Sequence, residues 1–186
     1  SGARGMAVMI ALRNLSRLLL SWPIALSAAL GVAMAMPTGA SAQETNISAE
    51  LVPDGPAIPG QDLMLALHFT PKSGWHGYWK NPGDAGYGMQ LDWRLPPGWK
   101  AGEPLYPVPQ RLVISGLMNH VYEGDYAVLV PLKVPAGTSA GLPVPVGLDA
   151  QWLACTDKIC VPERASLSLS LRTSGQTVRN KDFDLW

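Results

Sequence analysis

The sequence lacks an excess of charge of either sign, because its 14 basic and 14 acidic residues cancel. The balance is uneven along the chain. The segment 1–42 carries three arginines and no acidic residue, which leaves 11 basic against 14 acidic residues in the remainder. No run of lysines or arginines offers a surface for a phosphate backbone or an anionic membrane. The composition therefore predicts a protein that does not bind nucleic acid.

Several motifs that carry common chemistry are also missing. The sequence has no glycine-rich phosphate loop, no serine nucleophile motif and no cysteine or histidine pattern typical of zinc sites. Three histidines, two cysteines and seven methionines could together supply ligands for a soft metal such as copper, but they show no tight spacing. We therefore expect neither a metal nor a cofactor, and copper handling is the least favoured of three functions considered below.

Charge and hydrophobicity set the segment 1–42 apart from the rest of the chain. Arg13 and Arg17 precede a nearly uncharged apolar stretch, Leu18–Met36, which is followed by the small residues Ala40–Ala42. This order is typical of a secretory signal peptide, with Gln43 as the new amino terminus. Residues 1–5 precede a plausible start methionine, and we interpret them as a tag or upstream remnant.

The alternative for this stretch is a retained membrane anchor. Nineteen residues from Leu18 to Met36 approach the roughly 20 that span a bilayer. Pro23 and the small residues that follow the stretch favour cleavage instead. An exported protein enters an oxidising compartment, so its cysteines can pair.

Glycine, proline and period-two alternation predict an all-β fold for the remainder. Residues 43–186 hold 15 glycines and 15 prolines, which is dense enough to interrupt most helices. Alternation of apolar and polar residues, with one face to bury, is clearest in three segments. These are 63–69, 126–134 and 165–171. Shorter strands are expected at 47–52, 75–80, 89–94, 120–123 and 144–154. Turn residues separate these segments at the spacing of an antiparallel β-sandwich.

The two cysteines, Cys155 and Cys160, flank a short loop between two predicted strands. Residues that face each other in an antiparallel pair have Cα atoms about 4.5–5.5 Å apart, within the range that a disulfide tolerates. A bond across this hairpin is therefore geometrically reasonable. Closing a loop of roughly six residues stabilises a fold by only about 2 kcal/mol, against about 4.7 for a hundred-residue loop. The pair is either a modest structural clamp or a reversible redox couple.

Four segments of the sequence resemble the amino-terminal periplasmic domain of the DsbD/ScsB thiol–disulfide interchange proteins. They are GWHGYWKNPGDAG at 74–86, DWRLPPGW at 92–99, YEG at 122–124 and WLACTDKICVP at 152–162. The resemblance covers most of the chain from position 43 onwards. It implies an immunoglobulin-like sandwich at residues 43–172. Residues 173–186 are polar, and we expect them to be a tail or linker.

The resemblance also implies an activity and partners. The domain would receive electrons from a membrane electron-transfer domain of the DsbD/ScsB type, in the same chain or another. It would pass them to oxidised thioredoxin-fold proteins in the periplasm, as part of a protein-disulfide reductase linked to cytochrome c biogenesis. Cys160 would form the mixed disulfide and Cys155 would resolve it. A loop at about residues 106–118 would shield the pair. The alternative function is a non-catalytic exported binding module with a structural disulfide.

Four further residues are candidates to line such a site. His76 and Tyr78 lie in the first matching segment, which in this family is near the cysteine pair. Aromatic side chains on a sandwich strand also pack across strands without any other role. Lys158 could stabilise a neighbouring thiolate, whereas Asp157 would oppose it.

Overall fold

The computed structural model describes residues 45–174, 176 and 178–186, so the predicted signal peptide and remnant lie outside it. The described residues form ten strands and one short 3-10 helix. The strands are β1 (Ile47–Pro53), β2 (Asp62–Pro71), β3 (Gly77–Gly83), β4 (Gln90–Arg94), β5 (Lys100–Ala101), β6 (Gln110–Ile114), β7 (Leu117–Tyr122), β8 (Tyr126–Lys133), β9 (Pro143–Cys155) and β10 (Cys160–Arg172). The helix, η1, is Lys181–Leu185. None of the described helices is long and apolar enough to cross a membrane.

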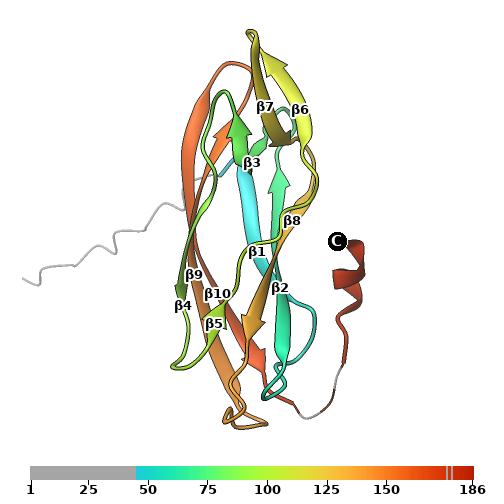
Figure 1. Cartoon of the computed structure of the whole chain (residues 1–186). Coiled ribbons are helices and arrows are strands. Elements are labelled where there is room, and N and C mark those ends of the chain that lie inside the picture. Colours follow the sequence, from blue (N-terminus) through green and yellow to red (C-terminus); the bar gives the residue numbers. More distant parts are fainter. Residues whose placement is uncertain (1–44, 175, 177) are drawn as a thin grey trace, which may run out of the picture. The chain divides into compact units, whose positions relative to one another are not determined.

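The strands form three antiparallel sheets (Figure 1). One has the order β1-β2-β8-β5, the second β10-β9-β4 and the third β3-β7-β6. The first two sheets pack face to face, because each presents one apolar face that must be removed from water. The predicted all-β, immunoglobulin-like antiparallel sandwich is confirmed.

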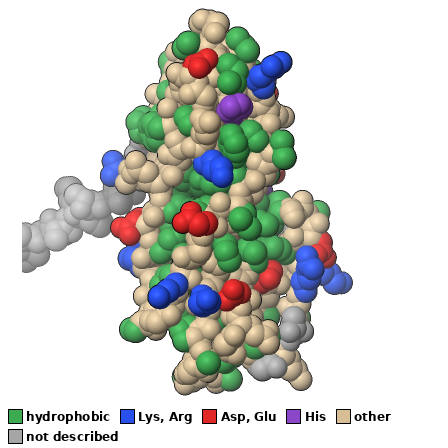
Figure 2. All heavy atoms as spheres, viewed as in Figure 1, with side chains coloured by type: hydrophobic (Ala, Val, Ile, Leu, Met, Phe, Trp, Pro, Cys, Tyr) green, Lys and Arg blue, Asp and Glu red, His purple; other side chains and the backbone are tan. Residues whose placement is uncertain are grey.

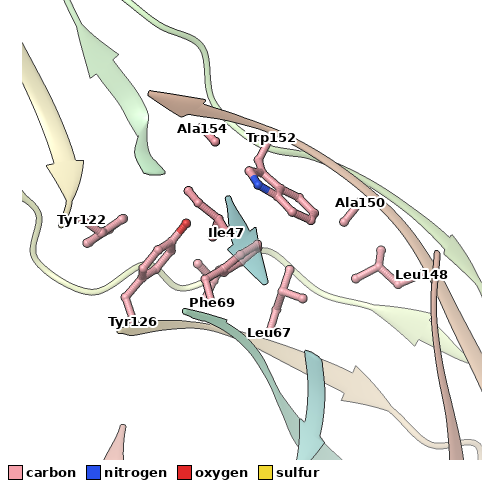
Figure 3. Close-up of a cluster of buried hydrophobic side chains, with 10 residues drawn as sticks. Ile47, Leu67, Phe69, Tyr122, Tyr126, Leu148, Ala150, Trp152 and Ala154 are labelled. Atoms are coloured by element: carbon pink, nitrogen blue, oxygen red, sulfur yellow. The ribbon is translucent and has the colours of Figure 1, made fainter. Parts of the chain in front are cut away.

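The core lies between these two sheets and follows the alternation seen in the sequence. Leu67 and Phe69 of β2 are completely buried, as are Val128 of β8 and Leu148 of β9. Figure 3 shows Phe69 and Leu67 on one side of the core, with Trp152 and Leu148 on the other. The rings of Phe69 and Trp152 meet edge to face, with centroids 5.2 Å apart. Such a pair adds about 0.5–1.5 kcal/mol beyond the burial of its area.

A buried carboxylate ties the amino-terminal strand to the second sheet. Glu163 of β10 accepts four hydrogen bonds through its two oxygens. Its Oε1 accepts from Asn46 N at 2.6 Å and Asn46 Nδ2 at 2.8 Å. Its Oε2 accepts from Ile47 N and from Trp152 Nε1, both at 3.1 Å. A charge taken out of water needs such partners, and here they link β1, β9 and β10.

The third sheet continues the second along the edge of β9. β4 pairs with residues 147–151 of β9, and beyond it His76 forms an isolated antiparallel bridge with Cys155. We expected a strand at 75–80, but β3 begins at Gly77 and runs to Gly83, with a bulge in its pairing to β7. The difference arises because the backbone of His76 pairs with β9 and not with β7.

A tight hairpin, β6–β7, completes the third sheet. Its two turn residues, Ser115 and Gly116, have φ angles of 51° and 84°. Two consecutive positive φ angles match the twist of the flanking strands, and the pairing of Ile114 with Leu117 closes the turn. The strand prediction at 120–123 captured only the end of β7 and missed β6.

The segment after β10 includes η1. Phe183 of η1 is buried against Ala66 of β2 and Ala127 of β8, on the face of the first sheet away from the core. Backbone and side-chain hydrogen bonds from Asn180 to Asp54 and Pro53 hold the approach to η1. Residues 178–186 therefore cover part of this outer face.

Candidate functional site at the cysteine hairpin

Cys155 and Cys160 form the disulfide that the hairpin pattern predicted. They face each other in the register of β9 and β10, with Cα atoms 4.1 Å apart. The N–H and C=O of Cys155 both bond to the backbone of His76, at 3.0 and 2.9 Å. Cys155 therefore faces Cys160 as a non-hydrogen-bonded pair, the type in which opposite residues approach most closely. Local pairing alone brings the two sulfurs together.

The two cysteines differ in accessibility. Cys155 is 0% exposed, whereas Cys160 lies at the exposed start of β10. Cys155 packs in a small cluster with Tyr78, Val121 and Leu153, and Leu112 lies against this cluster. Cys160 is therefore accessible to a second protein, whereas Cys155 is not.

This small cluster lies outside the main core. Trp152 and Ala154 of β9 point into the sandwich. Because side chains alternate along a strand, Leu153 and Cys155 point to the opposite face. The disulfide is thus on the outer face of the second sheet, where the third sheet adjoins it. A reaction at the sulfurs need not disturb the packing between the two main sheets.

The loop between the cysteines is organised by Thr156. Its Oγ1 accepts hydrogen bonds from the backbone N–H groups of Lys158 and Ile159, each at 3.1 Å, and its own N–H donates to Ile159 O at 2.8 Å. The side chain thus replaces water for two turn amides. Asp157 and Lys158, both proposed from the sequence, are exposed at the tip.

His76 and Tyr78, also proposed from the sequence, lie on the same side of the sheet as Cys155. His76 is 3% exposed, and its Nε2 has no hydrogen-bond partner. Burial lowers the pKa of His76, an effect that the negative charge of Glu123 partly opposes. The rings of His76 and Tyr78 meet edge to face at 5.4 Å. Burial raises the pKa of Tyr78.

The ring of Tyr78 rests on the backbone of Gly86. This glycine has a φ of +83°, and a Cβ added there would lie 2.5 Å from the Tyr78 ring. Any other residue at position 86 would meet both a strained backbone and a steric clash. Gly86, the last residue of the segment 74–86, therefore leaves the space that the Tyr78 ring needs in the cluster around Cys155.

A cavity of about 510 Å³ opens beside the hairpin. It is lined by His76, Glu123 and Asp157, together with Gly74 and residues 112–115 of β6 and its turn. The region where we expected a shielding loop, 106–118, thus contains β6, and Leu112 is the side chain there that packs on the Cys155 cluster. We did not identify Leu112 or Glu123 from the sequence. The Ser-Gly turn signal at 115–116 was the available clue to the hairpin.

Among residues 45–174, 176 and 178–186, no three or more histidine, cysteine or acidic side chains are grouped so that they could hold a metal ion.

This fold and this disulfide are those of a thiol–disulfide interchange domain. The chain belongs to the family described as "Thiol:disulfide interchange protein DsbD, N-terminal", whose sequence model matches residues 48–171. The match covers about two thirds of the chain and includes both cysteines. Comparison with curated protein sequences finds no match.

Two solved structures of similar proteins come from bacteria. The N-terminal periplasmic domain of ScsB from Proteus mirabilis is 18% identical, with a TM-score of 0.51. The comparison covers 75% of this chain and 49% of that one, so this chain spans about half the length of the ScsB structure. The Neisseria meningitidis DsbD N-terminal domain in its reduced form is 16% identical, with a TM-score of 0.45, covering 73% of this chain and 91% of that one. At such low identity, the ScsB comparison concerns the fold alone.

Proposed function

We propose that this domain is exported to the periplasm and relays electrons there. It receives them from a membrane electron-transfer domain of the DsbD/ScsB type, in the same chain or another. It passes them through Cys155 and Cys160 to oxidised thioredoxin-fold proteins, as part of a protein-disulfide reductase. The disulfide bond itself is the redox group, so the reaction needs no further cofactor.

The observation that carries this proposal is the unequal exposure of the two cysteines. Thiol–disulfide exchange requires a thiolate to approach a disulfide sulfur of the partner. Reduced Cys160 can make this approach from the exposed tip, whereas Cys155 is enclosed by Tyr78, Val121 and Leu153. Cys160 therefore forms the mixed disulfide, and Cys155 then releases the partner by attacking Cys160.

The surface around the hairpin supports contact with another protein. Ile159 on the loop is 55% exposed, and Val113 and Leu117 of the β6–β7 hairpin are 60% and 47% exposed. Figure 2 shows apolar side chains mixed with charged ones at the end of the molecule where β6 and β7 lie. Exposed apolar residues near a reactive group are typical of a surface that binds a protein transiently.

The test compares two single-cysteine variants, Cys155→Ser and Cys160→Ser. Each is reduced and mixed with an oxidised thioredoxin-fold protein, and covalent complexes are measured by mass spectrometry. We expect Cys155→Ser to accumulate a mixed disulfide, because the resolving thiol is absent. We expect no complex from Cys160→Ser, because its remaining thiol is buried.

The redox potential of the wild-type pair provides the second measurement. A potential between about −300 and −120 mV would agree with exchange in the periplasm. A value well below about −300 mV, with no complex from either variant, would mean that the bond is structural and that the proposal is wrong. The domain would then be a binding module with a clamped hairpin.

A further inference from the structure

Relay through this pair raises a question about one proton. In the reduced domain both cysteines are thiols, and Cys155 must lose its proton before it can attack Cys160. Only a thiolate is an effective nucleophile, and apolar burial raises the pKa of a thiol. Cys155 is 0% exposed, and its cluster neighbours Tyr78, Val121 and Leu153 are themselves buried. Solvent is therefore poorly placed to take this proton.

One basic side chain, that of His76, is well placed to take the proton of Cys155. His76 and Cys155 exchange both backbone hydrogen bonds, so they are directly opposite each other and their side chains lie on the same side of the sheet. Cys160 is directly opposite Cys155 on the other side. His76, Cys155 and Cys160 thus form a row across three neighbouring strand segments, with Cys155 in the middle.

His76 is also unusual in its hydrogen bonding. Its Nε2 is one of only two buried side-chain nitrogen or oxygen atoms in the described residues that have no partner; the other is Asn119 Oδ1. Leaving a buried polar atom unpaired is unfavourable, so it needs an explanation. In the disulfide form present here, neither cysteine carries a hydrogen to donate. Reduction gives Cys155, which is directly opposite His76, a hydrogen to donate.

We propose that His76 Nε2 accepts the proton of Cys155 when the domain releases its partner. This inference rests on the proposed relay function. His76 would hold the Cys155 thiol by an S–H···N hydrogen bond in the reduced state and take its proton during the resolving step. Burial lowers the pKa of His76, so the imidazole is neutral at neutral pH and its lone pair is available.

The resolving step exchanges one disulfide bond for another. The mixed disulfide joins Cys160 Sγ to a sulfur of the partner, and Cys155 carries the remaining thiol. The proton passes from Cys155 Sγ to His76 Nε2, and the thiolate attacks Cys160 Sγ. The Cys155–Cys160 bond forms, the bond from Cys160 to the partner breaks, and its electron pair leaves on the partner's sulfur, which takes up a proton from water. His76 Nε2 then releases its proton to water. The domain loses two electrons and two protons over both exchange steps, and the partner's disulfide becomes two thiols.

The charges around His76 suit a transient imidazolium. Glu123, which directly follows β7, and Asp157, on the cysteine loop, both line the cavity that His76 borders. Tyr78, on its own segment, faces it through the edge of its ring. Among the described residues that line this cavity there is no lysine or arginine. Two carboxylates and a new thiolate would therefore stabilise the protonated ring.

The test separates the two exchange steps in time. The reduced domain is mixed by stopped flow with excess dithiobis(nitrobenzoate), a small disulfide whose coloured thiolate is released once in each step. The first phase reports the attack of Cys160, and the second reports the attack of Cys155. In His76→Gln we expect the first phase to change less than twofold and the second to slow at least tenfold at pH 7.

The pH profile distinguishes proton transfer from a packing defect. The second-phase rate of the wild type should level off near neutral pH, whereas that of His76→Gln should keep rising into the range where free thiols ionise. His68→Gln, on the outer face of the first sheet, is the matched control and should leave both phases unchanged. Equal rates and equal profiles in His76→Gln and the wild type would overturn the inference. Absence of the first phase in the wild type would overturn the relay itself, and with it the role of His76.

A measurement on the wild-type fold covers the case in which His76→Gln does not fold. With ¹⁵N-labelled histidine, the Nε2 resonance of His76 should shift between the oxidised and reduced domain, because the thiol hydrogen bond forms on reduction. In reduced Cys155→Ala the resonance should return to its position in the oxidised protein. A resonance that is the same in all three samples would show that Cys155 does not donate to His76.

Discussion

Replacing Glu163 by glutamine tests how the amino-terminal strand is held. The carboxylate accepts two hydrogen bonds on each oxygen, and glutamine keeps its shape but turns one oxygen into a donor group. The bonds from Ile47 and Trp152 are buried, whereas those from Asn46 are only partly buried. We expect the glutamine oxygen to stay with the buried donors and the amide nitrogen to face Asn46.

The expected loss of stability in Glu163→Gln comes from the hydrogen bonds of Asn46. Two donors of Asn46 lose a charged acceptor, and hydrogen bonds to charged groups are worth about 1.5–3 kcal/mol each. Water can replace part of the loss at this partly buried position, so we expect a decrease in the free energy of unfolding of about 3 kcal/mol. For a domain of about 140 residues, this corresponds to a Tm lower by roughly 10 °C.

Thermal unfolding followed by circular dichroism measures the effect, with Glu103→Gln as the matched control. Glu103 is exposed, so its substitution removes the same charge and should change stability by less than about 0.5 kcal/mol. If both variants unfold at the same temperature, the four hydrogen bonds do not stabilise the strand and the reasoning is refuted.

Three other outcomes are expected. Reducing the Cys155–Cys160 bond should lower Tm by only about 7 °C, because loop closure contributes about 2 kcal/mol to stability. Calorimetry with and without reductant measures the change in Tm, and complete unfolding on reduction would contradict the expectation. Gly86→Ala should destabilise the domain by more than about 1 kcal/mol in denaturant unfolding, because the φ of Gly86 is +83° and the new Cβ meets Tyr78. Gly137→Ala is the control and should not destabilise the domain by this amount, because a Cβ there meets no atom within 4 Å and φ is not positive. Because burial lowers the pKa of His76, the unfolded chain binds a proton at this histidine more readily than the folded domain does, so stability should fall as pH decreases below about 6.5. The difference in Tm between pH 7.5 and pH 5 should therefore be smaller in His76→Gln than in the wild type. Equal differences would refute this expectation.

The sequence predicted the sandwich and the hairpin disulfide because both depend on local patterns. Alternation places Leu67 and Phe69 on one face whatever the rest of the chain does, and the register of a short hairpin follows from its loop. The strand containing Trp75 and His76 was placed less accurately. Its first residues pair with β9 and its later ones with β7, and a non-local choice of partner leaves no trace in the local pattern.

The candidate site could also be predicted from the sequence only in part. The sequence identified Cys155 and Cys160, and the family resemblance suggested His76 and implied that Cys160 forms the mixed disulfide, but the sequence did not indicate that Cys155 is buried. That depends on Leu112 and Val121, which reach Cys155 from the β6–β7 hairpin, a part of the chain distant in sequence. Glu163 was not identified either, because its four donors come from the start of β1 and the residue before it, and from β9.

The length of the β9–β10 ladder has a consequence for the lifetime of any covalent complex. Each strand has 13 residues, and their pairing continues without a break from the cysteines to the far end. When the sulfur–sulfur bond opens, this ladder keeps the two thiols as neighbours, so the second acts on the first at a very high effective concentration. A covalently bound partner would therefore be released quickly, and the mixed disulfide would be short-lived.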